Sequence, residues 1–150
     1  MDSWDTLYKW EWFRRPQWIS HFRERKASLN ESVASLARRR IGSDARVLDC
    51  SCGLGFHTVL FHEAGFQVSG SDRSSVAVSQ ARQLASSEGF AIRFFESSWA
   101  DLADRISEPF DVVFCDALSG SPNRQEFEGA LRGVRGAIRP GGCVEFRGAS

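Results

Sequence analysis

The amino-acid sequence predicts an α/β domain built on a doubly wound, mostly parallel sheet. Two observations carry this prediction. From Arg46 onward, short apolar runs rich in Val, Ile and Phe alternate with helix-like stretches, and such alternation forms right-handed crossover units with helices on both faces of a parallel sheet. The 150 residues, 42% of them hydrophobic, also suffice for one domain with its own core.

The strands are expected at residues 46–50, 66–71, 91–96, 110–116 and 143–147, the last after the turn Arg-Pro-Gly-Gly. Helices are expected between them, at residues 56–65, 74–88, 100–106 and about 123–137. Gly65 and Gly89 close the first two of these helices. Before the sheet, apolar side chains at near-helical spacing predict one or two helices that end at Gly42.

We therefore divide the chain into an N-terminal lead, residues 1–44, and a core, residues 45–150. The lead holds four of the five tryptophans and a cluster of basic residues. Its aromatic side chains either pack on the domain's own surface or form a lid that keeps water from a ligand. Its basic residues either form a solvated helix face or touch an anionic group.

Charge and cysteine use argue against several classes of protein. Nineteen basic and nineteen acidic residues leave no net charge to attract nucleic acid or an anionic membrane. The chain shows no export signal and no apolar stretch of about 18 residues, so we expect no membrane span. The four cysteines lie in or beside apolar runs without a Cys-x-x-Cys pair, which favours reduced thiols in the cytoplasm and no metal site.

The end of the first strand is the place to look for a ligand, because open parallel sheets bind molecules beyond the carboxyl ends of their strands. There Gly53 and Gly55 form a turn into the next helix, and glycines let a bound molecule approach the backbone. Asp72 ends the second strand, where a carboxylate can accept hydrogen bonds from two ribose hydroxyls. Together these features predict a nucleoside-containing ligand.

Two further residues narrow the choice of cofactor. Thr58 stands where the dinucleotide-binding fingerprint has its third glycine. Asp49 is poorly suited to a pyrophosphate but well suited to a ligand that carries an ammonium and a sulfonium group. The pattern disfavours NAD and favours S-adenosylmethionine.

The segments VLDCSCGLGFHTVLF, GSDRS, FDVVFCDALS and AIRPGGCVEF, in this order and spacing, resemble the class I S-adenosylmethionine-dependent methyltransferases. The stretches EAGFQVSGSDRS and YKWEWF add a similarity to glycine and sarcosine N-methyltransferases. The resemblance implies a Rossmann-like core that transfers a methyl group to a small-molecule nucleophile, in particular an amine. The reaction would be an in-line displacement that leaves S-adenosylhomocysteine.

The resemblance also implies which residues contact the cofactor. In chain order these are Asp49, Cys50, Gly53, Gly55, Asp72, Arg73, Ser98, Trp99 and Cys115. Asp49 and the two glycines would hold the methionine end, and Asp72 the ribose. Ser98 stands where the family usually has an acidic residue near the adenine amine.

Asp116 and His57 are the candidate catalytic residues. Asp116, which ends the fourth strand, would face the reactive end of the cofactor and orient an amine substrate, or it caps a turn. His57 begins the helix after the glycine turn and would act near the cofactor, or it satisfies local backbone groups.

The resembled core continues past its fifth strand, whereas this sequence stops at FRGAS. Three interpretations stay open: a truncation, a short chain whose sheet is completed by a second copy or a partner chain, and a module that binds the cofactor without catalysis. We expect the second, because an open sheet edge invites association.

Overall fold

The computed structural model describes residues 22–24, 44–116 and 124–147. Its strands are β1 (Arg46–Cys50), β2 (Gln67–Asp72), β3 (Arg93–Glu96), β4 (Phe110–Asp116) and β5 (Ile138–Arg147). Its helices are α3 (Phe56–Glu63), α4 (Ser75–Ser87), α5 (Leu102–Arg105) and α6 (Arg124–Gly136). Most of the predicted N-terminal lead lies outside the described residues, so the division at residue 44 stays a prediction.

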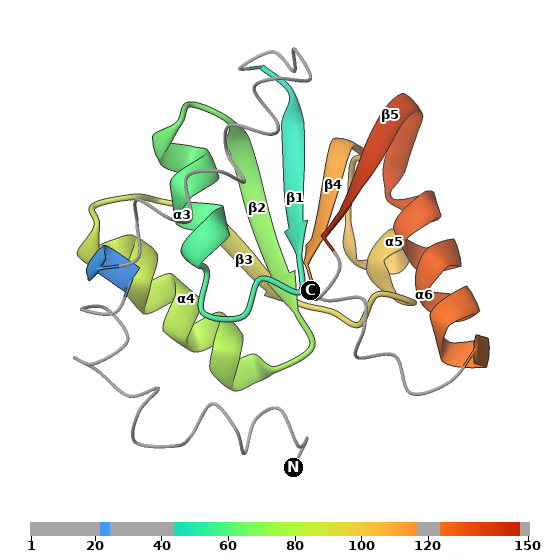
Figure 1. Cartoon of the computed structure of the whole chain (residues 1–150), viewed down its shortest axis with the longest axis horizontal. Coiled ribbons are helices and arrows are strands. Elements are labelled where there is room, and N and C mark those ends of the chain that lie inside the picture. Colours follow the sequence, from blue (N-terminus) through green and yellow to red (C-terminus); the bar gives the residue numbers. More distant parts are fainter. Residues whose placement is uncertain (1–21, 25–43, 117–123, 148–150) are drawn as a thin grey trace.

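The five strands form one sheet in the order β3-β2-β1-β4-β5, and all neighbouring strands pair in parallel (Figure 1). From β1 the chain first builds outward through β2 and β3, then returns to the other side of β1 to add β4 and β5. The predicted doubly wound fold is confirmed. The strand order reverses between β1 and β4, which is where sheets of this kind bind ligands.

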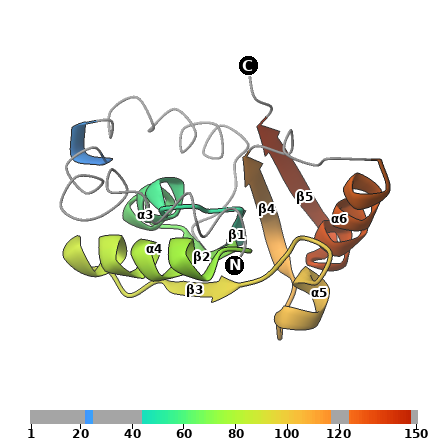
Figure 2. The same cartoon turned by 90° about the horizontal axis from the view of Figure 1, so that it is seen from below.

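Side chains that alternate along the central strands bury against two different helical layers. Val47, Val112 and Phe114 belong to an apolar cluster with Phe61 of α3 on one face of the sheet. Leu48 and its neighbours on the opposite face pack with residues of α5 and α6. Figures 1 and 2 accordingly show α3 and α4 on one side of the molecule and α5 and α6 on the other. Two-sided burial explains why these strands read as nearly continuous apolar runs.

One aromatic residue of the N-terminal lead is described, and it packs on the core. Phe22 is fully buried in the cluster formed by α3, α4 and β3, and its ring centroid lies 5.1 Å from that of Phe56. For this residue, packing on the domain's own surface is the observed role. The aromatic residues at positions 4 to 18, for which a lid was the alternative, lie outside the described part of the chain.

The fifth strand is longer than the sequence predicts. It begins at Ile138, and its pairing with β4 then shifts register so that Cys143 continues the ladder. The intervening Arg-Pro-Gly-Gly is therefore a bulge within the strand instead of a turn before it. Two glycines permit it, because Gly141 has a φ of 84° and a Cβ on Gly142 would lie 2.6 Å from a carbonyl oxygen of β4.

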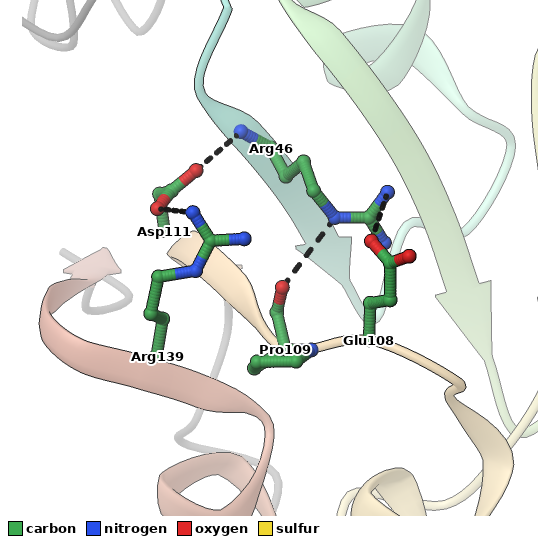
Figure 3. A network of polar contacts seen from close by, with 5 residues as sticks. All are labelled: Arg46, Glu108, Pro109, Asp111 and Arg139. Carbon is green, nitrogen blue, oxygen red and sulfur yellow. Dashed lines mark hydrogen bonds and ion pairs between the residues drawn. The ribbon is translucent and has the colours of Figure 1, made fainter.

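A polar network fastens the amino ends of β1, β4 and β5 to one another. Asp111 accepts a hydrogen bond of 2.8 Å from the backbone N–H of Arg46 and forms an ion pair of 2.9 Å with Arg139 in the bulge (Figure 3). The Arg46 guanidinium in turn donates to the carbonyl of Pro109 and faces Glu108. One carboxylate thus connects three strands at the end of the sheet where β1 and β4 begin.

Within the described residues, no helix has the length and apolar character needed to cross a bilayer.

Gly133→Ala should destabilise the fold by about 1–3 kcal/mol, because overpacking a tight contact forces backbone shifts. A Cβ on Gly133 of α6 would lie 1.8 Å from the carbonyl oxygen of Trp99. The matched control is Gly129→Ala on the same helix, whose Cβ would meet nothing nearer than an Arg132 side-chain nitrogen at 3.9 Å. That variant should gain up to about 1 kcal/mol from helix propensity. Urea denaturation measures both, and equal effects would contradict the packing argument.

Candidate functional site

The sheet brings several predicted site residues to one edge. In the register of the strands, Cys50 at the end of β1 lies beside Ser71 of β2 and Cys115 of β4. The turn that follows β1, the end of β2 and the end of β4 therefore meet at the carboxyl edge of the sheet, as predicted. Figure 1 shows the connections from β1 to α3 and from β2 to α4 leaving the sheet at this edge.

The turn between β1 and α3 is tightly wound. Ser51, Gly53 and Gly55 all have positive φ values, of 61°, 54° and 83°. The backbone N–H of Cys52 donates to the carbonyl of Ser71 at 2.8 Å, and that of Gly55 donates to the carbonyl of Cys52 at 2.9 Å. The first bond attaches the turn to the end of β2. The second bond connects residues 52 and 55 within the turn, just before α3 begins.

Gly55 is needed for a reason that differs from the sequence interpretation. A Cβ at this position would lie 2.9 Å from the Ala81 Cβ and 3.4 Å from the Phe94 ring. It would therefore point toward α4 and β3. The absence of a side chain here lets α3 pack closely on its neighbours, and the φ of 83° adds a second requirement for glycine.

Asp72 connects the glycine turn to the start of α4. Its Oδ2 accepts a hydrogen bond of 2.9 Å from the backbone N–H of Gly53, and its Oδ1 accepts one of 2.9 Å from Ser74. The residue is 7% exposed. Hydrogen bonds from fixed backbone groups to a carboxylate are strong, so this side chain is held in one orientation at the edge where the predicted ligand would bind.

Asp49 is buried beside the turn and has a side-chain partner that the sequence interpretation did not foresee. The Thr58 hydroxyl donates to Asp49 Oδ2 at 2.6 Å, and the two residues are 0% and 2% exposed, respectively. The sequence interpretation used Thr58 only as the absence of a third glycine. In the structure its side chain, on α3, orients the Asp49 carboxylate near the end of β1.

The loop from β3 to α5 also reaches the glycine turn. The indole Nε1 of Trp99 donates a hydrogen bond to the Ser51 hydroxyl. The Ser97 N–H donates to the Asp72 carbonyl at 2.9 Å. The Ser98 hydroxyl accepts a bond of 3.2 Å from the Asp101 N–H at the start of α5. The loop is thus tied to both β1 and β2, while a contact of Ser98 with adenine stays a prediction.

Two cysteines at this edge, Cys50 and Cys52, have thiols whose pKa is raised. Burial raises the pKa of Cys50 well above its usual value, and the adjacent Cys115 thiol raises it further. Burial likewise raises the pKa of Cys52, helped by the carboxylates of Asp49 and Asp72. The four cysteines form no disulfide. No cluster of three or more metal-ligating side chains exists among the residues that the structure describes.

The candidate catalytic residues are less completely described. His57 lies in the first turn of α3, half-buried, with its ring centroid 5.6 Å from that of Phe114 and 6.5 Å from that of Phe61. Arg73 is exposed just beyond β2. Asp116 is the last residue of β4, and its side chain lies outside the described part of the chain. Roles for these three residues stay predictions.

Sequence reasoning missed Ser51, Thr58 and Ser74 as members of this site. Ser74 could have been found, because a serine three residues before Ala77 is a helix N-cap pattern, and its hydroxyl accepts the Ala77 N–H at 3.1 Å. Ser51 gave no signal, since serine rarely adopts positive φ. Thr58 and Asp49 are nine positions apart in the sequence, and their contact depends on how α3 packs against β1.

A depression of about 430 Å³ lies elsewhere, at the opposite end of the sheet, with Arg46, His62 and Phe110 among its lining residues. None of the predicted site residues lines it. This depression therefore lies away from the end of the sheet at which the sequence predicts the ligand.

Comparison with known proteins agrees with the geometry. A family model described as a methyltransferase domain matches residues 47–142. A glycine/sarcosine N-methyltransferase from Aphanothece halophytica is 30% identical over 115 residues, which are 77% of this chain and 38% of the relative. A ubiquinone biosynthesis O-methyltransferase from Pseudomonas syringae is 33% identical over 104 residues, 67% of this chain and 43% of the relative. The chain thus spans less than half the length of these two relatives.

Solved structures show the same fold. An S-adenosylmethionine-bound amino pentose methyltransferase from Micromonospora echinaspora superposes with a TM-score of 0.72 at 22% identity, over 89% of this chain and 56% of that one. A methyltransferase from Clostridium acetobutylicum superposes with a TM-score of 0.69 at 19% identity, over 79% of this chain and 48% of that one.

Thr58→Val should lower the free energy of unfolding by about 1–3 kcal/mol, because a buried carboxylate then loses a hydrogen-bond donor. Thr58→Ser is the control that retains the hydroxyl, and it should lose less. Urea denaturation of the three proteins at neutral pH measures the difference. If Thr58→Val, which keeps a methyl group at this position, is as stable as the wild type, the hydroxyl bond does not stabilise the fold.

The raised thiol pKa of Cys50 predicts a pH dependence of stability. An unfolded thiol ionises near about pH 8.5, whereas the folded one stays protonated, so above that pH the unfolded state binds fewer protons and stability falls. The share of one such thiol is about 1.4 kcal/mol per pH unit. Denaturation between pH 7.5 and 9.5 in reductant should therefore show a shallower fall for Cys50→Ala than for the wild type. Ser87→Ala, which removes no titratable group, is the control and should follow the wild type. If the curve for Cys50→Ala runs parallel to that of the wild type, the raised pKa of Cys50 is refuted.

Proposed function

We propose that this chain, which belongs to the methyltransferase domain family through the match of residues 47–142, transfers a methyl group from S-adenosylmethionine to a small-molecule acceptor. S-adenosylmethionine is the cofactor of the family, and S-adenosylhomocysteine is the product it leaves. The observation that carries the proposal is the hydrogen bond of 2.9 Å between the Gly53 N–H and Asp72 Oδ2, which unites the glycine turn with the acidic end of β2.

The residues at the carboxyl edge fit this cofactor. Its methionine end carries an ammonium and a sulfonium group, and Asp49 places a buried carboxylate beside the turn that would receive it. Its ribose carries two hydroxyls, for which the held carboxylate of Asp72 is a suitable acceptor. We assign the methionine end to Asp49, Cys50, Gly53 and Gly55. The adenine end falls to Arg73, Ser98 and Trp99 in the same proposal.

The cofactor, when bound, supplies a methyl group already activated by the sulfonium. The chain's own task is then to bind, orient and exclude water, since an aligned attack gains most of its rate from positioning. Asp116 would orient the acceptor at the end of β4, next to Cys115. Because their pKa values are raised, Cys50 and Cys52 are neutral thiols and not nucleophiles that compete with the acceptor.

An amine is the acceptor that we propose. The glycine/sarcosine N-methyltransferases from Aphanothece halophytica and from Halorhodospira halochloris support an amine, the second at 25% identity over 146 residues. The similarity to an O-methyltransferase is of the same size. The longer matches to the N-methyltransferases favour nitrogen over oxygen, and a panel of amine and hydroxyl acceptors tests this choice.

We also propose a compartment and partners for the protein. Four free cysteines without a disulfide support a reducing compartment such as the cytoplasm. β5 is one of the two edge strands of the described sheet, and an open edge supports pairing with a second copy or a partner chain. A balance of charge near zero supports a small molecule over nucleic acid.

Isothermal titration of the purified chain tests the proposal first, with S-adenosylmethionine, S-adenosylhomocysteine and NAD, alongside light scattering for the oligomeric state. Binding of the first two but not NAD, followed by transfer of labelled methyl to glycine, sarcosine or another amine, would support it. Binding without transfer to any acceptor would favour the alternative of a cofactor-binding or partner-stabilising module. Binding of NAD alone would contradict both.

Asp72→Asn should weaken binding of S-adenosylhomocysteine about 10- to 100-fold, because a hydrogen bond to a charged group is worth about 1.5–3 kcal/mol. The matched control is Asp111→Asn at the other end of the sheet, where the carboxylate also holds a backbone N–H. That variant should lose stability and keep its affinity. If both variants bind like the wild type, the ribose contact lies elsewhere.

A further inference from the structure

We infer that Trp99 is a positioning residue for the cofactor, which acts through the hydrogen bond from its indole Nε1 to the Ser51 hydroxyl. This bond holds the glycine turn in its binding conformation before the ligand arrives. The inference rests on the proposed cofactor site and adds to it a residue pair that works on the turn itself. Trp99 would have this role whether or not its ring also touches adenine.

Ser51 is the part of the turn that needs such support. It directly follows β1 and has a φ of 61°, and it is the one non-glycine residue with positive φ among the described residues. A side chain in this left-handed region is disfavoured by contact of its Cβ with the backbone. The conformation persists only where surrounding structure fixes it. The hydrogen bond from Trp99 reaches this residue through the hydroxyl, which is the group that could hold it.

Trp99 is itself firmly anchored, so it can impose a position on Ser51. Its side chain packs against the apolar cluster between the sheet and α5 and α6, which includes Leu102 and Phe110. Its carbonyl accepts the Leu102 N–H at 3.3 Å and lies so close to Gly133 of α6 that no Cβ fits between them. The indole N–H thus extends from a packed layer toward the turn.

A second connection joins the same two segments and closes a ring. The Ser97 N–H donates to the Asp72 carbonyl, and the Asp72 side chain accepts the Gly53 N–H. The glycine turn is therefore held at Gly53 through β2 and at Ser51 through Trp99. Removal of the indole N–H would leave the hydrogen bond between Gly53 and Asp72 intact. It would release Ser51, which has the least favourable backbone conformation of the turn.

The consequence for binding is thermodynamic. A turn that is ordered in advance costs the ligand little conformational entropy, whereas a loosened turn must be ordered during binding. Loss of the Trp99–Ser51 bond should thus weaken cofactor binding even where every group that touches the cofactor is still present.

A double-mutant cycle tests the inference. Trp99→Phe removes the N–H and keeps an aromatic ring, and Ser51→Ala removes the acceptor. Each should weaken binding of S-adenosylhomocysteine about tenfold in titration, and the double variant should bind no worse than the weaker single variant, because both changes break the same bond. Ser51→Gly should bind more tightly than Ser51→Ala, since glycine adopts the positive φ without support.

Amide hydrogen exchange of the ligand-free chain gives a readout that does not depend on binding. In Trp99→Phe and Ser51→Ala, the N–H groups of residues 52–55 should exchange faster than in the wild type. Ser87→Ala is the control, because its hydroxyl donates to the Leu84 carbonyl near the end of α4, away from the turn. It should change neither affinity nor exchange at the turn.

Different results would contradict the positioning role of Trp99 and the proposed function. A wild-type chain that binds no S-adenosylhomocysteine would contradict the proposed function. Unchanged exchange in the turn, or single losses of affinity that add in the double variant, would overturn the positioning role, because Trp99 and Ser51 would then act independently.

Discussion

The Asp72 carboxylate is the constraint on which the rest of the site depends. One oxygen holds the glycine turn at Gly53, and the other holds the first residue before α4 at Ser74. The end of β2 therefore fixes two loops at once. A side chain with a single oxygen acceptor could not do so, which gives this position a structural reason to be acidic beside any role in contacting a ligand.

Buried polar contacts at this edge are arranged in pairs that cross from one element to another. Thr58 of α3 reaches Asp49 of β1, and Trp99 of the β3–α5 loop reaches Ser51. A buried polar group without a partner is costly, so each such pair also restricts how its two elements can move. These contacts limit how far the elements at this end of the sheet can move relative to one another, which would suit the proposed reaction, since that reaction depends on alignment.

The sequence predicted most of the strands and helices, and it predicted that the glycine turn and Asp72 would meet at one end of the sheet. Strand and helix positions follow from apolar periodicity, and Gly65 and Gly89 end α3 and α4 as expected. The start of β5 was missed, because a bulge reads as a turn when only Pro and Gly are visible. The hydrogen bonds of Ser51 and Thr58 were also missed, because each joins two different elements and depends on where the side chains point in the fold. That Gly55 contacts a ligand stays a prediction, while the packing of its Cα against Ala81 could not be predicted without the structure.

Asp111 lies at the end of the sheet where none of the candidate binding residues gathers, and there it connects the starts of β1, β4 and β5. Asp111 thus helps to align these strands on the side remote from the proposed cofactor site. A redesign of the loops at the carboxyl ends of the strands would leave this alignment in place, since the contacts that hold it lie at the opposite end.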